Sequence, residues 1–264
     1  MENQDTIQPE QPTNEIEELS HTDKIVGVIS EPSNLFSKLA FLSTKATDWL
    51  LPLFLLIIVA IVSTFIYMSN PEIKLEMQQQ QEKAMREQFQ KMVESGQMTQ
   101  QQVDEQLDKT AEMMNNPMII YLIPSISIFV IMLLWFFIFT TIAFLIAKFA
   151  FKGDGSYSQA MTAMGLSMYI SVLQSIILVI VGLLMGKMLT GLNPASLTGM
   201  DIKTLPGFLL SRLDVFSIWF YIVVGIAFAK MFKSDNVKKY IFTSIGFWLV
   251  FMFIIFGLSK VSPM

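Results

Sequence analysis

The sequence contains no cysteine, which excludes disulfides, thiolate metal sites and cysteine nucleophiles together. It also contains a single histidine, His21, which lies in a polar N-terminal segment. We expect this side chain to be solvated and without partners. A zinc site needs three or four converging ligands, so no metal site and no metal or organic cofactor is expected.

Charged residues are also scarce. Only 15% of the residues are charged and 53% are hydrophobic, with 22 Phe and 19 Met. Soluble domains usually carry about a quarter charged residues, so the deficit indicates a lipid-facing surface. The few charges are also uneven: seven acids and no Lys or Arg precede Lys24. Nucleic acid is therefore not an expected partner.

The N-terminal segment differs in composition from the rest of the chain. Residues 1–28 are rich in Glu, Gln, Pro and Asn, and we interpret them as a disordered acidic tail. Leu35, Leu39 and Leu42 then recur at helical spacing after Ser33, which predicts a short helix in the membrane interface. Residues 29–264 are expected to form one membrane domain.

Long uncharged runs dominate that domain. A run of about 20 residues at 1.5 Å per residue matches the ~30 Å hydrocarbon core of a bilayer. One such run could be a buried helix of a soluble protein, but several together could not. The predicted fold class is all-α, a polytopic membrane protein with a bundle of five transmembrane helices. The spans are about 49–68, 124–147, 160–186, 215–232 and 240–259, with Pro124 marking the start of the second.

The loop between the first two spans, about 72–115, is predicted to be a helical hairpin. Gly96 supplies the break, and Thr99 with Gln102 forms a capping box for the second helix. Each helix carries an apolar stripe: Met85, Phe89 and Met92 on the first, and Val103, Leu107 and Met114 on the second. The two stripes can pack on each other, or the methionines can form a contact surface for a partner.

Lysines in short connections decide the expected orientation. The two shortest connections, Lys148 to Ser158 and Lys230 to Lys239, hold six lysines between them. Positive residues in short loops favour the cytoplasmic side. We therefore place these connections and the N-terminus in the cytoplasm, and Met264 outside.

The spans contain no residues that suggest catalysis or ion coupling. No charge lies in their central turns, which argues against a pump. Their Ser, Thr and Gln side chains can bond between helices or line a substrate path, and the first use is favoured. These polar positions are Ser125, Ser127, Thr140, Thr141, Ser167, Ser171, Gln174 and Ser175.

Three glycines are candidates for close helix packing. Gly182 and Gly186 form a GxxxG pair in the third span, which suits either packing within the chain or dimerisation. Gly225 lies in the fourth span. Just before this fourth span, Arg212 and Asp214 can form an ion pair at the membrane interface, but no nucleophile or second acid flanks them. No catalytic residue and no enzymatic activity is predicted.

Several stretches together resemble the bacterial branch of the Yip (Ypt-interacting protein) domain family. They are ISEPSNLFSKLA, TDWLLPLFLL, AKFAFKGDGSYSQAMTAMGLSMY, and LDVFSIW followed by Gly225 and KKYIFTSIGFW. The similarity covers roughly Ile29 to Leu258. It implies a five-span protein with a cytoplasmic N-terminus, in the cytoplasmic (inner) membrane of a bacterium.

Eukaryotic members of that family bind Rab-type GTPases. Their acidic-Leu-Tyr-Gly-Pro signature is absent here, and their Gly-Tyr pair appears only as Gly165 and the displaced Tyr169. Rab-type GTPase binding is therefore not expected. The expected partners are the lipid bilayer and other membrane proteins or a second copy of the chain. Two functions stay open: a non-enzymatic scaffold or adaptor that organises membranes, and a small-molecule permease or channel component.

Overall fold

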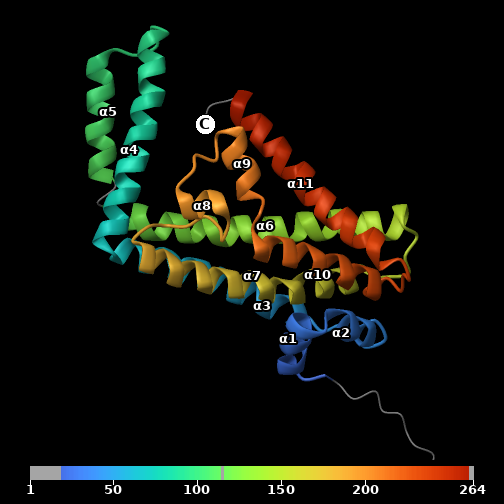
Figure 1. Ribbon diagram of the computed structural model, residues 1–264. Coiled ribbons are helices and arrows are strands. Elements are labelled where there is room, and N and C mark those ends of the chain that lie inside the picture. The colour runs from blue at the N-terminus through green and yellow to red at the C-terminus, as the bar shows by residue number, and fades with distance from the viewer. Residues whose placement is uncertain (1–18, 114–115, 262–264) are drawn as a thin grey trace, which may run out of the picture.

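The computed structural model describes residues 19–113 and 116–261, and all secondary structure within those ranges is helical. Figure 1 shows how the elements are arranged. The elements are α1 (His21–Ser30), α2 (Pro32–Leu39), α3 (Thr47–Ser69), α4 (Pro71–Glu94), α5 (Gln100–Met113), η1 (Met118–Leu122), α6 (Ile123–Leu145), η2 (Ile146–Ala150), α7 (Tyr157–Met185), α8 (Pro194–Thr198), α9 (Leu205–Ser211), α10 (Val215–Met231) and α11 (Val237–Val261).

The long apolar helices form the body of the molecule. In Figure 1, α3, α6, α7 and α10 run side by side, while α11 leaves the group at an angle toward the C-terminus. Helix α7 packs against α3 and α10, and α10 also packs against α11. Many large apolar side chains on these helices are exposed, for example Leu134, Phe242 and Leu258. An exposed apolar surface of this extent is stable only against lipid, so the chain is a polytopic helical membrane protein.

Four helical segments are long and apolar enough to cross a membrane, and a fifth crossing is possible if α9 and α10 form one span. Helix α10 has only 17 residues, about 25 Å, which is short for the hydrocarbon core. The seven-residue helix α9 precedes it, and the two are bent by 57° at their junction. The expected span 215–232 is thus the second limb of a bent pair.

The second span also extends further than the sequence indicated. Helix continues from Met118 through Ala150, 33 residues, with a π-helical turn at each end. Pro124 was expected to mark the start, but it lies in the first turn of α6, where it follows η1 without a break. The reason is that proline is tolerated in the first turn, and the wider π turn before it accommodates the missing amide hydrogen.

The bundle has two distinct ends. At one, which we call the turn end, the α6–α7 and α10–α11 connections lie beside the end of α2: the Thr44 and Ser158 hydroxyls are 2.6 Å apart, and Gln159 Nε2 donates to the Ala40 carbonyl at 3.2 Å. At the other, the hairpin end, α4 and α5 project away from the bundle (Figure 1). The two lysine-rich connections and the N-terminal helices therefore lie at the same end of the bundle, as expected from the sequence.

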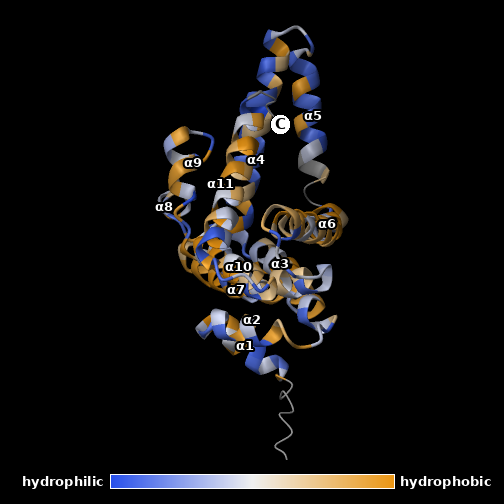
Figure 2. Cartoon of the chain, turned by 90° about the vertical axis from the view of Figure 1, so that its right-hand side faces the viewer, coloured by the Kyte–Doolittle hydropathy of each residue, from blue (hydrophilic) through white to orange (hydrophobic). Residues whose placement is uncertain are grey.

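The α4–α5 hairpin has the predicted form. Gly96 has a positive φ of 73°, and Thr99 and Gln102 exchange backbone-to-side-chain hydrogen bonds of 2.9 and 3.3 Å. Val103 and Leu107 are buried, and α5 contacts α4, so the two helices pack on each other. Figure 2 shows both helices mainly in the hydrophilic colour. Met114 lies outside the described residues.

The N-terminal segment is more ordered than the prediction of a tail over residues 1–28. Residues 1–18 lie outside the described residues, but His21–Ser30 is helix α1, with a capping box between Ser20 and Asp23. Val28 in α1 and Phe36 in α2 are both 0% exposed. The prediction was wrong for residues 21–28, because composition alone does not reveal that a few apolar side chains dock on a neighbouring bundle.

Candidate functional site

Two similar turns form the turn end of the bundle. Phe151–Asp154 (FKGD) follows η2, and Phe232–Asp235 (FKSD) follows α10. The lysine of each turn has a positive φ, 57° at Lys152 and 54° at Lys233. The turns pack together, since the Asp154 amide donates to the Phe232 carbonyl at 3.1 Å. The two turns thus share the sequence Phe-Lys-Gly/Ser-Asp.

The turn end is strongly basic. The two connections carry Lys148, Lys152, Lys230, Lys233, Lys238 and Lys239 but only Asp154 and Asp235. Among the described residues, the ion pair within these connections is Lys233 Nζ to Asp154 Oδ2, at 3.9 Å. The Lys239 ammonium lies 3.8 Å from the centre of the Phe151 ring. Several exposed ammonium groups therefore remain at this end without a carboxylate partner.

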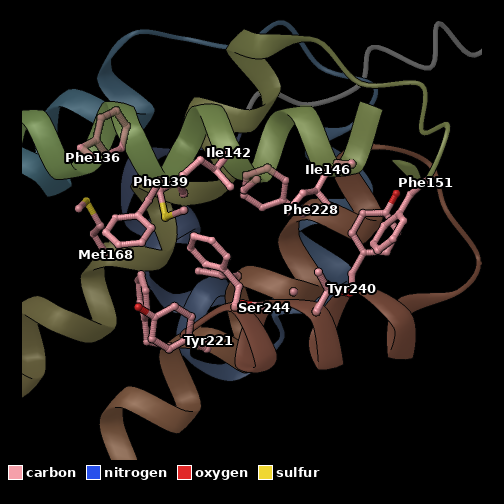
Figure 3. Close-up of a pocket in the computed structure, with 18 of the residues that line it drawn as sticks. Phe136, Phe139, Ile142, Ile146, Phe151, Met168, Tyr221, Phe228, Tyr240 and Ser244 are labelled. Carbon is pink, nitrogen blue, oxygen red and sulfur yellow. The ribbon is translucent and has the colours of Figure 1, made fainter. Parts of the chain in front are cut away.

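Next to these lysines is an apolar cavity between α6, α10 and α11, with a volume of about 140 Å³ (Figure 3). Aromatic rings make up nearly half of the residues in its wall. They come from α6 and from Phe151 after η2 on one side and from α10 and α11 on the other, and Met164 and Met168 of α7 also line the cavity. The ring residues include Trp135, Phe139, Phe151, Phe228 and Phe247.

Two hydroxyls at the cavity have no hydrogen-bond partner in the described part of the chain. They belong to Tyr240 and Ser244 of α11, which both line the cavity. Tyr240 is only 4% exposed. The Ser234 hydroxyl lies near the Tyr240 oxygen, but their geometry does not make a hydrogen bond. A buried hydroxyl without a partner is costly, so each can donate to an acceptor that enters the cavity.

A second polar cluster fastens the N-terminal helix to the bundle. Lys24 Nζ of α1 donates to Asp48 Oδ1 of α3 at 2.6 Å, and the two side chains are 6% and 1% exposed. His21 Nε2 lies 2.5 Å from the Tyr169 hydroxyl of α7, and its Nδ1 lies 4.0 Å from Asp48 Oδ1. These contacts connect α1 to both α3 and α7.

The prediction of a solvated His21 without partners was therefore wrong, since its ring contacts α7. Burial lowers the pKa of His21, the Asp48 carboxylate opposes that shift, and the Lys24 ammonium adds to it. Within the described residues, no group of three or more His, Cys, Asp or Glu side chains is arranged to hold a metal ion.

At the hairpin end of the bundle, Asp214 accepts hydrogen bonds from several elements and does not pair with Arg212. Its carboxylate caps α10 at the Ser217 amide (2.8 Å) and also accepts from Gln174 Nε2 (3.0 Å) and from the Leu192 amide (2.7 Å). Arg212 bonds to the neighbouring Ser211 hydroxyl at 2.8 Å. The expected pair does not form, because Asp214 faces inward to α7.

The predicted glycines lie at close contacts within the chain. A Cβ atom on Gly225 would lie 2.5 Å from the Ile241 Cα of α11, and one on Gly182 would lie 2.6 Å from the Tyr67 hydroxyl of α3. Gly186 ends α7 in the left-handed conformation with φ of 65°, beside the Glu72 carboxylate. Gly165, which the sequence reasoning did not select, would place a Cβ 2.4 Å from the Trp49 backbone.

Three of the eight polar side chains named in the spans bond to their own helix. Ser125, Ser167 and Ser175 each donate to the carbonyl four residues earlier. Gln174 reaches Asp214, as described above. These bonds occupy part of the polar groups that a solute path would need, whereas the buried Thr140 hydroxyl has no partner among the described residues.

Comparison with known proteins identifies the family of the chain. The Yip1 domain family model matches residues 26–258, which is most of the chain. No curated protein and no solved structure matches the chain.

Proposed function

Because the chain belongs to the Yip1 domain family, we propose that it is a non-enzymatic scaffold or adaptor that organises membranes. Members of this family are generally non-enzymatic. Its long apolar helices lie in contact with lipid. The projecting α4–α5 hairpin is the observation that carries the proposal, because a detached polar element is suited to contacting a second protein.

Three properties of the hairpin support this role. In the described residues its contacts with the bundle lie near its base, where α4 meets α3 and Ile73 packs against Val179 of α7. Its helices carry nine acidic and five basic residues, so a partner with a basic surface would be favoured. Met85, Phe89 and Met92 are only partly buried, which leaves soft apolar contact area along α4.

A permease is the second candidate, and the described contacts favour it less. Several span hydroxyls bond to their own backbone, and the cavity between α6, α10 and α11 is lined almost entirely by aromatic and aliphatic side chains. A polar solute would find few free groups in either place. We retain the permease only as an outcome of the test below.

The test is purification of the full chain in mild detergent, alongside a variant whose residues 78–109 are replaced by a short Gly-Ser linker, which keeps Met77 in its contact with the bundle. We expect a stoichiometric protein partner to be retained by the wild type and lost by the variant. Both chains should melt at the same temperature, because the bundle does not depend on the outer hairpin. A bound small solute retained by both chains, with no protein partner, would favour the permease.

The proposed location is the cytoplasmic membrane of a bacterium, with the N-terminus and the turn end in the cytoplasm. The lysines of the turn end support this orientation. Single cysteines introduced at Ser95 in the hairpin and at Ser234 in the turn end can be labelled in intact cells. An impermeant reagent should react with the first only, and reaction with the second alone would reverse the orientation.

A further inference from the structure

We infer that the cavity between α6, α10 and α11 binds one acyl chain of an anionic phospholipid, whose phosphate is held by the lysines of the turn end. This site is independent of the proposed scaffold role. Three features of the described residues carry the inference: the shape and lining of the cavity, the position of the lysines at its end, and the two hydroxyls without partners.

The cavity has the chemistry of a hydrocarbon site. Its volume of about 140 Å³ is close to that of engineered apolar cavities, of about 150 Å³, that stay dry and take up benzene. A helix of a second protein has a diameter of about 10–12 Å and cannot enter such a space. A segment of an acyl chain can.

The lysines lie where the phosphate of such a lipid would be. Phe151 and Tyr240 line the end of the cavity at the turn end, and the Lys239 ammonium lies over the Phe151 ring at 3.8 Å. Lys148 follows Ala147, another residue of the cavity wall. Lys238 and Lys239 are exposed, and Lys148 is half-buried; none of the three forms an ion pair with a described residue. Basic groups beside a pocket between spans are typical of anionic headgroup sites.

The hydroxyls of Tyr240 and Ser244 lie where the ester groups of a bound phospholipid would be, between its phosphate and its acyl chain. A phospholipid carries ester carbonyls there, which accept hydrogen bonds but do not donate them. Tyr240 and Ser244 each have a hydroxyl that lacks a partner in the structure. A bound ester would satisfy one or both, and would remove the cost of burying them.

The experiment compares phosphatidylglycerol with phosphatidylcholine. The full chain is purified, exchanged into detergent without lipid, and titrated with each lipid, and retained lipid is counted by native mass spectrometry. We expect the wild type to retain one phosphatidylglycerol at least ten-fold more tightly than phosphatidylcholine. Equal retention of the two lipids would overturn the headgroup assignment.

The lysines are tested with matched triple variants. Lys148→Gln, Lys238→Gln and Lys239→Gln together should weaken phosphatidylglycerol binding on the order of 100-fold, at about five-fold per lysine. Phosphatidylcholine should be unaffected. The control removes three lysines of α4, by Lys74→Gln, Lys83→Gln and Lys91→Gln. Equal losses in the two triple variants would show non-specific attraction and overturn the site.

The acyl chain is tested by filling the cavity. Ser244→Leu should lower retention of both lipids alike, by about ten-fold, and should leave the fold intact because it removes a hydroxyl that has no partner. If this variant fails to fold, Ala143→Leu fills the same cavity from α6. Wild-type retention in a folded filled variant would overturn the acyl-chain site. Competition by soluble glycerol phosphate would do the same, because it would show that the phosphate alone is recognised.

Discussion

The hairpin end and the turn end both carry many charges, but they use them differently. On the hairpin, Arg86 pairs with Glu82 on the same helix, and both side chains are more than half exposed. Near the turn end, Lys24 and Asp48 pair between two elements and are almost fully buried. The same chemical contact is therefore a surface feature at one end and a structural joint at the other.

The largest expected effect comes from breaking the buried ion pair between Lys24 and Asp48. Lys24→Met should destabilise the protein by about 3–5 kcal/mol, because it leaves the Asp48 carboxylate buried without its cation. Thermal or denaturant unfolding in detergent measures this loss. The matched hairpin variant Arg86→Met should cost only about 0.3–0.5 kcal/mol. Similar losses in the two variants would remove the distinction between the ends.

A control separates the charge from the packing. The double variant Lys24→Met/Asp48→Leu removes both charges at once, so it should recover much of the stability that the single variant loses. If it is no better than Lys24→Met, the loss comes from packing of the lysine stem.

A smaller effect is expected where α10 meets α11 at the turn end. Gly225→Leu must place a side chain against the Ile241 backbone, and crowding of this kind typically costs about 1–3 kcal/mol. The melting temperature should fall while the oligomer size, measured by light scattering, stays constant. Gly246→Leu in α11 is the control, because a Cβ there meets nothing within 4 Å. Equal melting of the two variants would mean that the α10–α11 contact is loose.

The smallest effect concerns pH, and it is confined to the N-terminal joint. The pKa of His21 is lowered in the folded protein, so the folded state binds the proton less well than the unfolded state. Stability is therefore full above about pH 6.5, and it decreases as the pH falls below that value. Lys24, Asp48 and Tyr169 are the ionisable groups that face the ring, and the hairpin contributes none.

Hydrogen exchange of α1 between pH 7.5 and pH 5.5 measures this change. Protection of α1 should decrease toward the acid end, while protection of the hairpin should not. His21→Gln should remove most of the dependence, since His21 is the single histidine of the chain. Persistence of the full dependence in that variant would assign it to another group.

The parts of the fold that follow from local patterns were predictable from the sequence. Apolar runs predicted the long helices, and Thr99 with Gln102 predicted the start of α5, because each signal lies within one element. The bent α9–α10 pair was not predicted, since a bend of 57° depends on which surfaces the two helices find. The match to the Yip1 domain confirmed the resemblance to that family and does not test its bacterial branch.

The candidate site was much less accessible to sequence reasoning. His21 and Lys24 lie within a polar stretch, and nothing local indicates that they meet Asp48 and Tyr169. The cavity is formed by helices that are distant along the chain, so its lining cannot be read from any one of them. The one available signal was the repeated Phe-Lys-Gly/Ser-Asp sequence at the two turns.

Those two turns have a consequence for any attempt to stabilise the protein by design. Lys152 and Lys233 adopt a backbone conformation that suits glycine, and replacing either with glycine should relieve about 1 kcal/mol of strain. Each replacement also removes one positive charge from the turn end. A designer who optimises only folding would make both changes and deplete the most basic region of the molecule. At these two positions, stability and positive charge therefore favour different amino acids.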